Sequence, residues 1–267
     1  MPLTGTLRTL LLRGLLAGLI AGLLAGTVGY FVGEPNVEAA IAIEEAGAAA
    51  ESAHTEGGAH ADEGAGGGHS HGDDGEALVS RSGQKAGQFL ALGLAGMAFG
   101  AIFGAVAHVA RRYTALSGPK LAFGLGIGGW AAIVAVPFFK YPANPPAVGD
   151  PETINDRTLL WVAAVLLGLV AVGAGVYVWK LLAGRLDTVR LTAGVGTFVL
   201  LATIGYLVLP GVNEVGADFP ASLLWEFRVS SLAVSTTLWA CLGLGYAILT
   251  EFADRTGASA PEVAAAA

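Results

Sequence analysis

Residues 11–33 read LLRGLLAGLIAGLLAGTVGYFVG, and this stretch decides the fold. Arg13 is its one charged residue. Because a helix needs about 20 mostly apolar residues to cross the hydrocarbon core of a bilayer, the stretch predicts a membrane span. Glycine recurs at every fourth position of this helix, at Gly14, Gly18, Gly22 and Gly26. A helix face without side chains lets a neighbouring helix approach closely, so we expect this face to pack against another span.

The rest of the chain repeats this character. Of its 267 residues, 54% are hydrophobic and 13% are charged, whereas a soluble domain has about 45–50% apolar and about 25% charged residues. Apolar windows near the length of a span cover Leu10–Val32, Ala86–Ala110, Leu121–Phe139, Leu159–Leu182, Leu191–Leu209 and Leu223–Leu249. We therefore predict an all-α, polytopic integral membrane helix bundle of six transmembrane helices. Five spans are the alternative, because the first window could be a signal peptide and the fifth is short.

The basic residues predict how the chain lies across the membrane. With the N-terminus inside, nine lysines and arginines fall on the inside and five on the outside. The loops after the second and fourth spans are the most basic, as the positive-inside rule requires. The acidic residues divide in the opposite sense, with seventeen outside and four inside. We therefore expect a multi-pass protein of the bacterial cytoplasmic membrane with its N-terminus and C-terminus inside.

The spans divide the chain into four parts. We expect an N-terminal tail with the first transmembrane helix, an acidic His-containing extracytoplasmic loop that is partly disordered, a five-helix transmembrane region, and a flexible C-terminal tail. These parts cover residues 1–32, 33–85, 86–250 and 251–267, respectively. Disorder is expected in residues 51–76, which contain 8 Gly and no apolar side chain larger than alanine. Such a segment buries too little surface to offset the entropy of ordering.

Residues 51–76 also hold four of the five histidines of the chain and seven acidic residues. Imidazole and carboxylate groups together suit borderline divalent metals such as Co²⁺, Ni²⁺, Zn²⁺ and Cu²⁺. The spacing of these residues is irregular, so we predict weak capture at several sites rather than one rigid site. A solvated acidic linker is the alternative. The predicted metal-binding residues are His54, His60, Glu63, His69, His71, Asp73 and Asp74.

Polar residues in or beside the spans are candidates for an ion path, because ionisable groups are costly inside a membrane and mark pathways there. The glutamates just after the first span would form an entry rim, one histidine lies near the inner end of the second span, and a polar stripe opens the sixth. The path candidates are Glu38, Glu44, Glu45, His108, Glu226, Arg228, Ser231 and Ser235. The alternatives are a histidine at the membrane interface and serines that make interhelical hydrogen bonds.

Several function classes are disfavoured by composition. A formal net charge of −7 argues against binding to nucleic acid, and a single cysteine rules out a disulfide framework or a Cys-based metal centre. The sequence has no P-loop and no H-E-x-x-H motif. Outside residues 51–76, His108 is the one histidine that could serve a catalytic set. We therefore predict that the chain is not an enzyme and has no tightly bound cofactor.

Four segments resemble the CbtA family of probable cobalt transporter subunits. They are the glycine-rich RGLLAGLIAGLLAG of residues 13–26, EPNVEAAIAIEEA of residues 34–46, VPFFKYPANPPAVGDPETINDRT of residues 136–158, and LPGVNEVGADFPASLLWEFRVSSLAVSTTLW of residues 209–239. The order of these segments along the chain carries the resemblance, since none of them is a catalytic signature. With four histidines, the loop that follows the second segment is sparser in histidine than that of many relatives.

The resemblance implies a membrane subunit of a cobalt uptake system linked to cobalamin synthesis. The transported ion would be Co²⁺, with Ni²⁺ and Zn²⁺ as alternatives, and the outer His/acid loop would capture it. The resemblance also implies a small partner subunit with one span and a His-rich tail. Membrane lipid and a second copy of the chain are the other expected partners. The alternative function is a non-transporting scaffold or assembly subunit, whose small-residue faces would bind partner helices.

Overall fold

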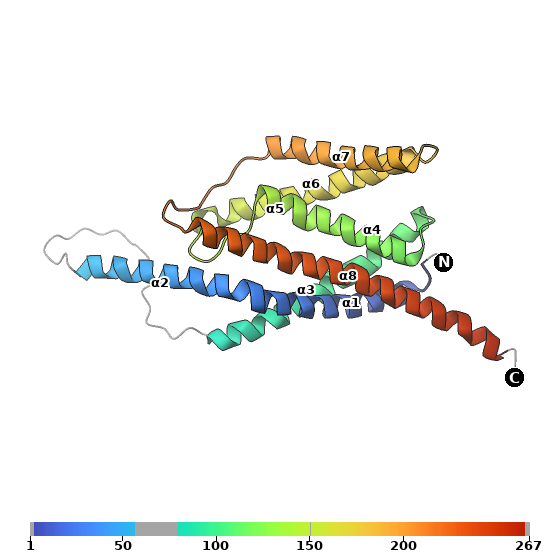
Figure 1. Cartoon of the computed structure of the whole chain (residues 1–267), viewed down its shortest axis with the longest axis horizontal. Helices are drawn as coiled ribbons and strands as arrows, with labels where there is room; N and C mark the ends of the chain where they lie inside the picture. The colour runs from blue at the N-terminus through green and yellow to red at the C-terminus, as the bar shows by residue number, and fades with distance from the viewer. Residues whose placement is uncertain (1–2, 57–79, 150, 265–267) are drawn as a thin grey trace.

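The computed structural model describes residues 3–56, 80–149 and 151–264, and the regular elements of these ranges are helices (Figure 1). The first run consists of α1 (Leu7–Val28), the π-helical segment η1 (Gly29–Gly33) and α2 (Glu34–Glu56). The second consists of α3 (Arg81–Ala110) and the 3₁₀ turn η2 (Arg111–Tyr113). The third consists of α4 (Gly118–Trp130), the π-helical segment η3 (Ala131–Ala135) and α5 (Val136–Lys140). The last elements are the 3₁₀ turn η4 (Pro151–Thr153), α6 (Ile154–Leu181), α7 (Asp187–Val208) and α8 (Ala221–Ala264).

Six of the helical runs are long and apolar enough to cross a membrane. They are Leu7–Ala49, Arg81–Tyr113, Gly118–Lys140, Ile154–Leu181, Asp187–Val208 and Ala221–Arg255. The predicted all-α bundle of six spans is thus confirmed. The five-span alternative would omit the first or the fifth apolar window. These windows lie in α1 and α7, which have 22 residues each.

The spans pack in an order that differs from their order in the chain (Figure 1). α1 packs against α3 and α8, α8 packs against α4, η3 packs against α6, and α6 packs against α7. In space the spans therefore follow one another as α3, α1, α8, α4, α6 and α7. The last helix of the chain is central, because it joins the α1–α3 pair to the rest of the bundle.

The two ends of the bundle hold different connections (Figure 1). We call the end from which α2 projects the α2 end and the other the N-terminal end. The α2 end holds residues 141–149, 151–153 and 209–220, and the N-terminal end holds residues 3–6, 111–117 and 182–186. The run Leu7–Ala49 has 43 residues and so is about 65 Å long at about 1.5 Å per residue, against about 30 Å for the hydrocarbon core. Much of α2 is therefore a stalk outside the membrane.

The α1–α3 interface depends on glycine. A Cβ atom added at Gly14 would lie 2.0 Å from the carbonyl oxygen of Gly100, and one added at Gly18 would lie 2.0 Å from the carbonyl oxygen of Gly96. Both distances are far shorter than van der Waals contact, so the two backbones touch where side chains would otherwise separate them. The glycine face predicted from the sequence is therefore the face that packs against α3.

The outer surface of α6 and α7 is apolar and exposed. Large side chains on it are more than half exposed, among them Leu166, Val170, Leu200 and Leu207. A soluble protein rarely leaves an apolar surface of this extent in water, and lipid chains cover it in a membrane. The exposed face therefore agrees with the six spans.

Two helices continue beyond the apolar windows. Residues 34–56, the start of the outer loop, continue the first helix as α2, and their alanine-rich sequence EPNVEAAIAIEEAGAAAE favours a helix because alanine is the strongest helix former. Likewise α8 runs beyond Thr250 to Ala264, and Arg255 Nη2 lies 2.6 Å from Glu251 Oε1 one turn earlier. Residues 57–79 lie outside the described ranges. The expected disorder of the loop and flexibility of residues 251–267 stay predictions.

Gly18→Ala is expected to destabilise the bundle, because its new methyl group would meet the backbone of α3 at 2.0 Å. The expected loss is about 1–3 kcal/mol of unfolding free energy, as for other overpacked interfaces. Thermal unfolding of the purified protein in detergent measures it. Gly173→Ala is the matched control, because a Cβ there has nothing within 4 Å. Equal melting temperatures for the two variants would contradict the role of close α1–α3 packing.

Candidate functional site

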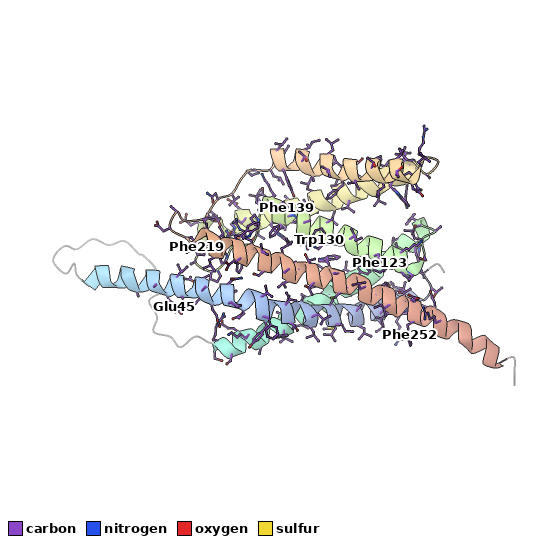
Figure 2. All side chains as sticks on the ribbon, in the orientation of Figure 1. Glu45, Phe123, Trp130, Phe139, Phe219 and Phe252 are labelled. Carbon is purple, nitrogen blue, oxygen red and sulfur yellow. The ribbon has the colours of Figure 1, made fainter. Side chains whose placement is uncertain are left out.

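A polar pocket of about 410 Å³ opens at the α2 end. Its walls come from the connection after α5, the first turns of α6, the α7–α8 connection and the second turn of α8. The polar and aromatic groups that line it are Tyr141, Asn144, Arg157, Thr158, Trp161, Asn213, Glu214 and Arg228. Figure 2 labels Phe219 at the end of the α7–α8 connection, next to the start of α8, and Phe252 toward the opposite end of α8. The pocket therefore draws on two of the segments that carry the family resemblance.

Arg228, one of the predicted path residues, lines this pocket and is half-buried. Its Nε donates to the carbonyl oxygen of Ala143 at 3.3 Å, and its Nη2 donates to Oδ1 of Asn144 at 3.0 Å. The Ala143 carbonyl oxygen is available because the proline-rich connection between α5 and η4 leaves backbone carbonyl groups without helical partners, and Asn144 lies in the same connection. The guanidinium therefore fixes this connection against α8.

Glu214 and Arg157 join the other two walls of the pocket. Glu214 Oε2 lies 2.7 Å from Arg157 Nη1, and the Thr153 hydroxyl donates to Glu214 Oε1. The Glu214 side chain is only 7% exposed, so its charge depends on these partners. Neither Glu214 nor Arg157 was among the predicted site residues. Their opposite charges, one in the first turn of α6 and one in the α7–α8 connection at the same end of the bundle, were the one signal that could have paired them.

Tyr141 closes the pocket toward the α7–α8 connection. Its hydroxyl donates to the carbonyl oxygen of Pro210 at 2.7 Å, and burial raises the pKa of the phenol. The phenol is therefore neutral at physiological pH and acts as a hydrogen-bond donor. Tyr141 therefore joins the connection after α5 to the connection after α7, while Arg228 joins the connection after α5 to α8.

A second charged cluster lies at the base of α2. Glu34 pairs with Arg81 at the start of α3, and Lys85 lies beside Glu34 and pairs with Glu38. Glu34 is largely buried, whereas the Glu38 side chain is half exposed. Glu38, predicted for the entry rim, is therefore neutralised by a neighbouring helix and fastens the stalk to the bundle.

The other two predicted rim residues, Glu44 and Glu45, lie farther along α2 and are exposed. Figure 2 labels Glu45 on the part of α2 that extends from the bundle. On α8, Glu226 is exposed and Ser231 and Ser235 are half-buried. The structure thus distributes these five residues along two helices.

Ser230 is a buried polar residue of α8 that lies beside the predicted stripe and was not among the predicted site residues. Its hydroxyl donates to the carbonyl oxygen of Phe227 at 2.8 Å, and Asn36 Nδ2 donates to the same hydroxyl at 3.4 Å. Ser230 is 2% exposed. It therefore connects α8 to the base of α2, as interhelical hydrogen bonds do in membranes.

His108 lies at the N-terminal end, opposite the pocket. It is half-buried, and its Nε2 is 3.2 Å from Nη2 of Arg112 one turn later. Arg111 donates to the carbonyl oxygens of Leu3 and Gly5, at 3.2 and 2.8 Å. The structure therefore does not bring His108 together with Arg228, and a path through both would have to traverse the bundle.

The predicted metal ligands fall in or beside the undescribed part of the chain. His54 lies on α2, and the other six lie within residues 57–79, outside the described ranges. Those six are His60, Glu63, His69, His71, Asp73 and Asp74. In the ranges that the structure describes, no group of three or more His, Cys, Asp and Glu residues is placed to hold a metal ion. The capture site therefore stays a prediction from the sequence.

Comparison with known proteins gives one match. A family model described as "Probable cobalt transporter subunit (CbtA)" matches residues 7–251. No curated protein and no solved structure matches the chain. The matched range includes the first five spans, the sixth span as far as Glu251, the pocket and both charged clusters.

Glu214→Ala is expected to lower stability, because it leaves the Arg157 guanidinium without its carboxylate and separates two walls of the pocket. The expected loss is about 1–2 kcal/mol, below the range for a fully buried pair because Arg157 is 32% exposed. The melting temperature of the purified protein measures the effect. Glu226→Ala, which removes an exposed glutamate at the same end of the bundle, is expected to stay within about 0.5 kcal/mol. A loss for Glu214→Ala no greater than that of the control would show that the pair is not structural.

Proposed function

The chain belongs to the CbtA family of probable cobalt transporter subunits, and on this premise we propose that it is the membrane subunit of a divalent-metal uptake system that supplies cobalamin synthesis. The ion is Co²⁺, with Ni²⁺ and Zn²⁺ as the alternatives. Six spans supply the membrane location that a transporter subunit requires.

The α2 end faces the outside in this proposal. The N-terminal end carries Arg111 and Arg112 after α3 and Lys180 and Arg185 around the α6–α7 turn. Basic connections stay on the cytoplasmic side of bacterial membranes. The acidic residues 51–76, which begin in α2, then belong to the outer side, in the compartment from which an ion arrives.

One observation carries the capture step, namely that four of five histidines and seven acidic residues gather in residues 51–76. α2 holds the start of this segment away from the bilayer, so incoming ions meet it before they meet the bundle. A cluster of negative charge also raises the local concentration of cations. Imidazole and carboxylate ligands follow the Irving–Williams order. The segment therefore concentrates Co²⁺ without selecting it over Ni²⁺ or Cu²⁺.

The proposed path runs from the exposed Glu44 and Glu45 toward α8. It continues past Glu226, Arg228 and the two serines of the polar stripe, and reaches the cytoplasm near His108. Glu38 contributes by anchoring α2 to Lys85. A small single-span subunit with a His-rich tail, lipid, and a second copy of the chain are the proposed partners.

The scaffold alternative loses part of its support. It assigned the glycine faces of the first two spans to partner helices, but these faces pack against each other as α1 and α3. A transport function does not require a helix face that is left free for a partner helix. We therefore keep the scaffold as the outcome that a flux measurement tests.

Replacing His54, His60, His69 and His71 together with alanine is expected to slow cellular uptake of radiolabelled Co²⁺ several-fold at limiting metal. At saturating Co²⁺ the rate is expected to match that of the unchanged chain, because capture affects occupancy and not translocation. Replacing Ser52, Thr55 and Ser70 with alanine is the matched control within the same segment. Equal uptake by both variants at limiting metal would remove the capture role.

Purified chain in liposomes is expected to carry Co²⁺ inward, alone or after addition of the one-span partner. A panel of Co²⁺, Ni²⁺ and Zn²⁺ with an enclosed metal-sensitive dye measures the flux and its selectivity. Liposomes without protein, and liposomes with the partner alone, are the controls. Absence of flux under both protein conditions would favour the scaffold function.

A further inference from the structure

The pocket at the α2 end contains a charge that the described residues leave without a counter-ion. Arg228 is half-buried, and the acceptors of its guanidinium are a backbone carbonyl oxygen and a side-chain amide oxygen. Among the described residues no carboxylate forms an ion pair with it. A partly desolvated cation held by neutral oxygens is stabilised further by any anion that reaches it.

The other charges of the pocket also favour an anion. Arg157 and Glu214 neutralise each other at 2.7 Å, and the second carboxylate oxygen of Glu214 accepts from Thr153. The lining is therefore left with one net positive charge. A bare divalent cation entering the pocket would meet two guanidinium groups and one carboxylate that is already paired.

Neutral donors surround the two guanidinium groups. The side-chain oxygen of Asn144 accepts from Arg228, so its amide NH₂ is free to turn toward the pocket. The side-chain oxygen of Asn213 accepts from the Val215 amide at 3.4 Å, which likewise leaves an NH₂ group as donor. Arginine forks and amide donors match the oxygens of a carboxylate or a phosphate.

The size and the walls of the pocket set the class of ligand. A volume of about 410 Å³ is within the range of small-molecule sites. Trp161, Ile154 and Val212 add apolar walls beside the donors, which suits an anion with a short carbon frame. A lipid headgroup presents a similar oxyanion at this depth.

We propose that this pocket binds the oxyanion group of a small ligand, a carboxylate or a phosphate, through Arg228 and Arg157. The ligand supplies the counter-charge that Arg228 lacks, and the connections after α5 and α7 close around it. The site is separate from the metal-capture segment, and it does not rest on the direction or the identity of the transported metal.

Full-length protein in phosphatidylcholine nanodiscs tests this site with radiolabelled succinate and inorganic phosphate in equilibrium dialysis. Saturable binding of at least one probe is expected, and Arg228→Gln is expected to weaken it about tenfold or more, as for a lost charge-assisted hydrogen bond. Arg228→Lys keeps the charge and is expected to recover part of the affinity. Arg185→Gln, an exposed arginine at the other end of the bundle, is the matched control and is expected to bind as the unchanged chain does.

A second arm identifies a lipid source. Nanodiscs with phosphatidylglycerol are analysed by native mass spectrometry, and retention of this lipid that Arg228→Gln abolishes would assign the oxyanion to a headgroup. If Arg228→Gln does not fold, as judged by helicity and melting, Asn144→Ala decides, with an expected loss of several-fold. Absence of saturable binding and of retained lipid, or an equal loss in Arg185→Gln, would overturn the proposal.

Discussion

Lipid offers no hydrogen bonds, and this constraint governs the whole structure. Every backbone N–H and C=O group that crosses the hydrocarbon core needs a partner within the chain, and a helix supplies one for each residue. The same constraint removes the charges from the spans and leaves them at the two ends of the bundle. The charged clusters and the polar pocket therefore lie at the α2 end and the N-terminal end.

Packing inside such a bundle lacks the usual hydrophobic force, because lipid chains are as apolar as leucine. Close contact must supply the attraction instead. α1 and α3 achieve it through glycine, with backbone meeting backbone at Gly14 and Gly100. Gly168 of α6 has the same relation to Ala132 in η3, where an added Cβ would lie 2.2 Å from the carbonyl oxygen. One of these contacts lies between α1 and α3, and the other lies between η3 and α6. α8 links the two pairs, because it packs against both α1 and α4, and α4 runs directly into η3.

The sequence predicts the spans and the glycine face because both are local patterns, read from hydropathy over about 20 residues and from a repeat of four. Hydropathy alone does not mark where α2 and α8 end. Their polar, alanine-rich ends are not apolar enough to count as spans, yet they retain a strong helix propensity. The Glu214–Arg157 pair and the Ser230–Asn36 contact depend on segments 57 and 194 residues apart in the chain, and no local pattern encodes which connections meet.

At the α2 end the structure distinguishes acidic residues that pair with a neighbouring cation from acidic residues that stay exposed. The sequence alone did not distinguish these two groups. Glu34, Glu38 and Glu214 are each held by a cation on a neighbouring element, so they fasten the stalk and the connections. The acids left to attract a cation begin with Glu44 and Glu45 and continue along the stalk, away from the bilayer. The pocket at the helix ends has the opposite character, with its carboxylate paired and one guanidinium in excess. On the path proposed here, a metal captured at the stalk would therefore either pass this positive region or meet it already neutralised by an anion.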